Sequence, residues 1–189
     1  MEKKCSKSCK KNLQPMNSIS SDTDRIGLGG SCHWCTEAVF LSLKGVLRVK
    51  QGWIASGGEP ERFSEGVVVH FNPVIISLQT LIPVHLHTHS CASQHSMRDK
   101  YRSAVYAFNE QQALVCAEII ETLQAEFSDP IITKVLDFGS FILNKPEYLN
   151  YYFGNPDKPF CQNIVNPKLK QLLRDFNEQV DLNKLNHLT

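Results

Sequence analysis

The sequence lacks the features that would make it a membrane, nucleic-acid-binding or secreted protein. No apolar run approaches the roughly 20 residues that a transmembrane helix needs. Lys and Arg total 20 against 19 Asp and Glu, so the chain lacks the positive excess by which proteins bind nucleic acid or anionic lipid. The lysine-rich N-terminus is not followed by the apolar core of a secretory signal. We therefore expect a cytoplasmic protein that binds neither nucleic acid nor membrane.

A regular cysteine framework is also missing. The seven cysteines form an odd and unevenly spaced set: Cys5, Cys9, Cys32, Cys35, Cys91, Cys116 and Cys161. In a chain of 189 residues this pattern argues against a secreted disulfide scaffold. Cys5 and Cys9 lie in a polar, lysine-rich stretch and are expected to be incidental exposed thiols. Cys116 lies in an apolar helical stretch and is expected to pack in the core.

Cys32 lies where a glycine-rich strand end turns into a helix. Residues 26–30 have the apolar pattern of a short strand, and residues 37–44 have helical spacing of apolar positions. A thiol at a helix start faces unpaired backbone N–H groups and the positive end of the helix dipole, which favour the thiolate. Cys32 is thus a candidate nucleophile. The alternative is a small buried hydrophobic residue, the usual state of a single cysteine.

Strand and helix patterns alternate along the chain. Residues 1–24 are polar and serine-rich and predict a disordered extension, before one domain at 25–180 and a tail at 181–189. Strands are expected at 26–30, 46–53, 66–71, 101–108 and 133–138, and helices at 37–44, 77–87, 110–127 and 167–180. Residues from 145 to the last helix are aromatic and loop-like. This order predicts a mixed sheet with helices packed against it.

Four ordered blocks resemble the A-type peptide methionine sulfoxide reductases. Residues 29–40 are similar to the family's glycine-cysteine-phenylalanine-tryptophan signature, with Cys32 at the nucleophile and Trp34 at the tryptophan. The other blocks are residues 64–73, 100–103 and 155–168. Four blocks in order are far more specific than a single Cys-x-x-Cys motif. The resemblance implies an α/β (α+β) fold, a two-layer sandwich with a mixed sheet and packed helices, a ferredoxin-like core and an irregular C-terminal tail.

The resemblance also implies a reaction and the residues that perform it. The chain is expected to be a thiol-dependent oxidoreductase that reduces methionine (S)-sulfoxide in peptides and as the free amino acid. Cys32 would attack the sulfoxide sulfur while Glu65 protonates the oxygen, since desolvation beside an apolar pocket raises a carboxyl pKa. Tyr101 would donate a further hydrogen bond to that oxygen. Trp34 and His33 would form the wall of the methyl pocket.

Recycling of the oxidised enzyme needs a second thiol. Attack leaves Cys32 as a sulfenic acid, which condenses with another cysteine to a disulfide that a dithiol can reduce. Cys161 is preferred because it falls in a loop-like segment, and Cys35 comes second because it is expected to face inward. The reductant is expected to be thioredoxin or another dithiol. We expect oxidised proteins and peptides as the other partners, no bound cofactor or metal, and a monomer.

The sequence departs from the family pattern at several positions. His33 replaces the signature phenylalanine and would give the pocket a polar edge, so His33→Phe is expected to improve substrate binding, unless His33 pairs with the Cys32 thiolate. The short loop before Glu65 lacks the family's second tyrosine. Ser96 stands where an aspartate is usual, and Asp99, at a different spacing, cannot be assumed to replace it. Tyr148-Leu149 replaces a histidine-glutamine pair.

Three alternatives remain open from the residues alone. Cys32 and Cys35 could form the redox pair of a dithiol oxidoreductase. The altered pocket is also compatible with a catalytically impaired paralogue that acts as a binding or redox-sensing module. Finally, the ligand types His85, His87, His89 and Cys91 would share one face of an extended segment and could then bind zinc. The family has a helix at that point, which favours a histidine cluster without metal.

Overall fold

The strands form one closed sheet in the computed structural model, which describes residues 23–57 and 62–188. They are β1 (Asp24–Gly29), β2 (Val46–Ser56), β3 (Ser64–Phe71), β4 (Ala104–Ala107) and β5 (Lys134–Leu143). Their order is β1-β3-β2-β5-β4, and pairing of β4 with β1 closes the circle. The β4–β5 pair is parallel and the other pairs are antiparallel. The predicted mixed α/β fold is confirmed, and closure of the sheet is a feature that the sequence pattern did not predict.

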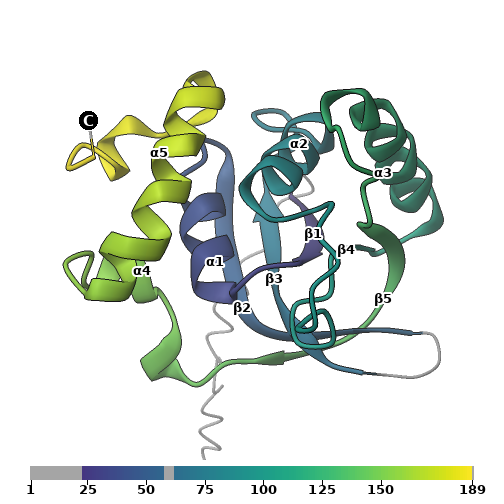
Figure 1. Cartoon of the computed structure of the whole chain (residues 1–189), viewed down its shortest axis with the longest axis horizontal. Coiled ribbons are helices and arrows are strands. Elements are labelled where there is room, and N and C mark those ends of the chain that lie inside the picture. Colours follow the sequence, from purple (N-terminus) through teal and green to yellow (C-terminus); the bar gives the residue numbers. More distant parts are fainter. Residues whose placement is uncertain (1–22, 58–61, 189) are drawn as a thin grey trace, which may run out of the picture.

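Helices cover the outside of this sheet in two groups. Figure 1 shows α1 (His33–Leu41) in front of the strands, with α4 (Tyr151–Gly154) and α5 (Asn166–Asp175) to one side of it. On the other side lie α2 (Leu78–Thr88) and α3 (Glu110–Leu123). Among the described residues, none of the helices combines the length and the apolar character needed to span a bilayer.

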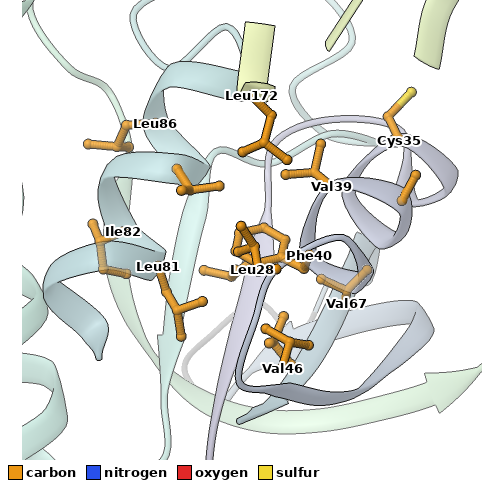
Figure 2. Packing of buried hydrophobic residues seen from close by; sticks show 14 of the residues in the cluster. Leu28, Cys35, Val39, Phe40, Val46, Val67, Leu81, Ile82, Leu86 and Leu172 are labelled. Atoms are coloured by element: carbon orange, nitrogen blue, oxygen red, sulfur yellow. The ribbon is translucent and has the colours of Figure 1, made fainter. Parts of the chain in front are cut away.

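The main hydrophobic core lies between the helices and the sheet (Figure 2). Phe40 from α1, Leu81 from α2 and Leu172 from α5 meet Leu28 and Val67 of the sheet, and all five are fully buried. Successive strand residues point to opposite faces. A second, smaller cluster therefore fills the interior of the barrel, formed by Ile54, Val68, Ala104 and Tyr106.

The element boundaries differ from the predicted ones mainly near the C-terminus. β5 extends to Leu143, α5 ends at Asp175, and the strand expected at 101–108 shortens to β4. The segment expected to be loop-like contains α4 and the π-helix η3 (Cys161–Val165). Tyr152 and Cys161 from this segment are buried in the main core, so tertiary packing imposes helical structure that the local pattern does not show.

The remaining domain predictions lie partly outside the described residues. The disordered extension predicted for 1–24, with Cys5 and Cys9, falls almost entirely outside them. Beyond Val180 the chain packs on the domain: Leu185 is fully buried, and His187 Nε2 lies 2.8 Å from the hydroxyl of Tyr152. The boundaries at 25 and 180 stay predictions.

Candidate active site

Cys32 is the N-cap residue of α1. Its carbonyl accepts the backbone N–H groups of Cys35 at 3.0 Å and Thr36 at 3.1 Å, so the first helical turn starts at this residue. Gly30 lies two residues before Cys32 and has a φ of +138°. A Cβ atom at this position would lie 2.6 Å from the ring of His89. Only glycine fits both the backbone conformation and this contact. The sequence thus folds locally to place the thiol at a helix start.

The Cys32 thiol has a lowered pKa of about 7. The largest cause is a hydrogen bond from the Cys35 side chain, and the backbone N–H of Trp34 acts in the same direction. Burial and the charge of Glu65 oppose them. A pKa near 7 leaves a substantial thiolate fraction at neutral pH, which is the reactive form of cysteine.

Cys32 opens onto a cavity of about 390 Å³. Five of the predicted site residues line this cavity, namely Cys32, His33, Trp34, Glu65 and Tyr101. Sequence reasoning missed its other lining residues, which are Trp53, Lys100, Asn144, Tyr148 and Phe160. They come from β2, the segment before β4 and the chain after β5. The aromatic composition after residue 145 was the one signal in the sequence that pointed to some of them.

Glu65 is buried but ion-paired. Its Oε1 lies 3.2 Å from Lys100 Nζ, and its Oε2 lies 2.7 Å from His33 Nδ1 and accepts the His33 backbone N–H at 3.1 Å. Burial alone would raise the pKa of Glu65, but the contacts from His33 and Lys100 outweigh it and lower the pKa below its ordinary value. The expectation of a raised pKa is therefore wrong, because the sequence did not reveal these partners.

Both ring nitrogens of His33 face protein groups. Nδ1 lies 2.7 Å from Glu65 Oε2, although its N–H direction is off the ideal line. Nε2 lies 2.9 Å from Asn144 Nδ2. The structure thus places a protein group beside each ring nitrogen, and the effect of His33 on substrate binding stays a prediction.

Aromatic rings pack around Trp34 in the cavity wall. The indole of Trp34 stacks on Tyr151 with centroids 4.0 Å apart, and Phe160 meets it edge-on at 5.5 Å. Tyr148 also lines the cavity and adds a second phenol to that of Tyr101. Asp99 lines a different cavity with Arg98 and Arg102, so it does not take the place of the missing aspartate.

The two candidate resolving thiols differ from expectation. Cys161 is the first residue of η3 and is fully buried, so the mobile loop expected around it is wrong. Cys35 is also buried, but its thiol donates to the Cys32 sulfur, and its pKa is raised by that hydrogen bond and by burial. Cys35 is thus already in contact with Cys32.

The histidine run is helical, as expected. His85 and His87 belong to α2, and His89 is its C-cap residue. His85 and His89 are buried and stack at 4.1 Å, whereas His87 lies 2.9 Å from Glu126 at the surface. These histidines therefore point in different directions and do not share the face that an extended segment would give them.

A thiolate at a helix start, facing an aromatic cavity with an ion-paired carboxylate, defines a thiol-dependent enzyme on a mixed α/β scaffold. The sequence model of the family described as peptide methionine sulfoxide reductase matches residues 24–180. The chain belongs to this family, and the predicted enzyme class, a peptide methionine sulfoxide reductase, is confirmed.

A curated relative agrees with this assignment, and solved structures share the fold. A peptide methionine sulfoxide reductase MsrA from Trichodesmium erythraeum is 32% identical over 175 residues, covering 83% of this chain and 98% of that protein. The fold resembles the reduced form of Mxr1 from Saccharomyces cerevisiae, with a TM-score of 0.65, 21% identity, and coverage of 75% and 90% of the two chains. Mxr1 in complex with Trx2 gives a TM-score of 0.56, 20% identity, and coverage of 71% and 88%.

Proposed function

We propose that Cys32 is the nucleophile with which this chain reduces methionine (S)-sulfoxide. The observation that carries the proposal is the position of the thiol, at a helix start and on the wall of an apolar, aromatic cavity. The S-methyl group of the substrate would lie against Trp34, where apolar contact replaces water. A pKa of about 7 supplies the thiolate for the attack.

In the chemical step the Cys32 thiolate attacks the sulfoxide sulfur and forms a bond between the two sulfur atoms, while one proton is taken up at the oxygen. The oxygen then passes to Cys32, so that this S–S bond and the S–O bond to methionine break and an S–O bond to Cys32 forms. Cys32 becomes a sulfenic acid, oxidised by two electrons, and the sulfoxide is reduced by two electrons to the thioether. The step therefore requires a cation or proton donor at the oxygen.

Lys100 and Tyr101 are the donors that the cavity offers to this oxygen. The pKa of Lys100 is raised by its hydrogen bond to Tyr101 and by Glu65, so its ammonium group stays charged. Such a preorganised charge stabilises the negative charge that develops on the oxygen. In this proposal Glu65 acts as a carboxylate that holds Lys100 and His33, and the Tyr101 hydroxyl donates a hydrogen bond. The proton that the oxygen takes up comes from solvent, which reaches the partly exposed Lys100.

For recycling, we propose that Cys35 forms the first disulfide. The Cys32 sulfenic acid and the Cys35 thiol condense to a disulfide and release water. The hydrogen bond between the two thiols supports this order. The role of Cys161 stays a prediction. Since Mxr1, a protein of similar fold, has been solved in complex with Trx2, a thioredoxin is the proposed reductant.

The test is reduction of both epimers of a methionine sulfoxide peptide, with dithiothreitol as donor so that no resolving thiol is needed. The S epimer should be reduced and the R epimer should not. Cys32→Ser should abolish turnover, because an alcohol at its ordinary pKa is not an anionic nucleophile. Cys91→Ser, at a buried cysteine away from the cavity, is the matched control. Wild-type turnover by Cys32→Ser would disprove the proposal.

A further inference from the structure

A chain of polar side chains links Glu37 to Glu65 through the wall of the cavity. Gln51 Nε2 donates to Glu37 Oε2 at 3.1 Å, and Gln51 Oε1 accepts from Asn144 Nδ2 at 2.5 Å. Asn144 Nδ2 lies 2.9 Å from His33 Nε2, and His33 Nδ1 lies 2.7 Å from Glu65 Oε2. Glu37, Gln51, His33 and Glu65 are all buried, so protein partners decide how these groups are oriented.

The donors and acceptors along this chain of side chains are fixed by the backbone carbonyl of Tyr148, which can only accept a hydrogen bond. Gln51 Nε2 also lies 2.8 Å from the backbone carbonyl of Tyr148, and a carbonyl has no proton to donate. Gln51 must therefore present its NH₂ group to Tyr148 and Glu37, whether or not Glu37 is protonated. Its Oε1 then faces Asn144, which must donate from Nδ2.

The same logic fixes the proton on His33. Asn144 Nδ2 donates, so His33 Nε2 must accept and carries no proton. A neutral imidazole has one N–H, and this places it on Nδ1, next to Glu65 Oε2. A second proton on Nε2 would require the Asn144 amide to turn away from Gln51 and lose their 2.5 Å contact.

We propose that Asn144 and Gln51 are positioning residues that hold His33 as the neutral Nδ1–H tautomer. The proposal rests on the proposed function, because it concerns the wall of that cavity. With Nε2 accepting from Asn144 and Nδ1 facing Glu65 Oε2, the uncharged ring presents carbon to the substrate methyl group and so replaces the phenylalanine of the family signature. Four charged or titratable groups surround the His33 ring. Glu65 comes from β3, and Lys100 is paired with Glu65. Cys32 is the N-cap residue of α1, and Glu37 lies within α1.

The direct test is the protonation state of His33 in the resting protein. Long-range ¹H–¹⁵N spectra of ¹⁵N-histidine-labelled protein report which ring nitrogen carries a proton, and His33→Gln identifies its signals among the seven histidines. At pH 7 we expect a protonated Nδ1 and an unprotonated Nε2. An Nε2–H tautomer or an imidazolium at pH 7 would overturn the proposal. This measurement needs no turnover, so it is independent of the proposed function.

Substitution of Asn144 tests the positioning role in activity. Asn144→Asp provides a carboxylate that accepts from Nε2–H, so the ring should become an imidazolium at pH 7. We expect kcat/KM for the S epimer to fall roughly tenfold at pH 7, as for small misplacements in other sites, and to recover as the pH rises. A loss equal at all pH values, or an unchanged His33 spectrum, would contradict the proposal. Asn163→Asp, at an exposed asparagine of η3, is the matched control.

Discussion

Lys100 places a positive charge in the wall of the cavity. Its Nζ lies 3.2 Å from Glu65 Oε1 and 5.1 Å from the centre of the Tyr101 ring. Glu65 is buried, whereas Lys100 is partly exposed, so the ammonium group is held at the rim. Electrostatic interactions are less screened beside an apolar cavity than in bulk water. A charge that is already in place can then stabilise the transition state without reorganisation.

At the same scale, His33→Phe should lower kcat/KM for the S epimer, the reverse of what the sequence alone suggested. Phenylalanine would remove the imidazole partners of Glu65 Oε2 and Asn144 Nδ2, which would keep only the backbone N–H of residue 33 and Gln51 Oε1, respectively. A lost hydrogen bond typically costs about 0.5–1.5 kcal/mol, so urea unfolding should also show lower stability. Dithiothreitol-driven kinetics provide the measurement, and exposed His95→Phe is the control. Improved kcat/KM would restore the view that the imidazole hinders substrate binding.

At the scale of elements, α1 carries most of the chemistry. Its N-cap residue is the nucleophile proposed here, its first turn supplies Trp34 and the second thiol, and its buried Glu37 anchors the polar chain. The helix is held by the sheet behind it and by α4, η3 and α5 beside it. Changes in η3 can reach the site through its packing on α1 and through its N-cap residue Phe160, which lines the cavity.

Cys35→Ala should raise the pKa of Cys32 above 7, because the hydrogen bond from Cys35 is the largest cause of the lowered value. Alkylation rates measured against pH give this pKa. Single turnover should persist, while thioredoxin-driven cycling should stop and sulfenic acid should accumulate. Cys161→Ser is the comparison and should leave the Cys32 pKa unchanged. A Cys32–Cys161 disulfide found by mass spectrometry in place of Cys32–Cys35 would assign the resolving role to Cys161.

At the scale of the whole molecule, buried histidines tie α2 to the closed sheet. His85 Nε2 lies 3.0 Å from the carbonyl of Gly29 at the end of β1. His89 Nε2 lies 2.8 Å from the Ser103 hydroxyl, which contacts the Thr133 hydroxyl at 2.7 Å. Burial lowers the pKa of His85 well below 6.5 and that of His89 to about 4. The fold therefore depends on two neutral imidazoles beside the strand that leads to Cys32.

This dependence predicts that stability falls in mild acid. The unfolded chain binds a proton at His89 near the ordinary pKa of 6.5, whereas the folded chain binds it only near 4. The contribution of neutral His89 to the free energy of unfolding is fully present above pH 6.5. It is lost as the pH falls toward 4 and amounts to about 3 kcal/mol. Urea unfolding from pH 7.5 to 4.5 measures the slope, and His89→Gln should reduce it while exposed His95→Gln should not. A free energy of unfolding that stays constant over this range would contradict the prediction.

Much of the fold follows from patterns of adjacent residues. Strand alternation located β1, β2 and β3, and the helical spacing of apolar residues located α2 and α3. The segment from 145 to 165 could not be predicted in this way, because its helices exist where Tyr152 and Cys161 enter the core. Closure of the sheet could not be predicted in this way either, since β1 and β4 are separated by two strands and two helices along the chain.

The sequence by itself determined the family and the place of the thiol, because a glycine-rich turn followed by a helix start is a property of contiguous residues. Only the tertiary structure decided the charge of Glu65, the partners of His33 and the burial of Cys161. Asn144 lies 111 residues after His33, and Glu65 lies 32 residues after it. The ionisation and orientation of a buried polar group depend on what surrounds it in space, and folding alone brings these residues together.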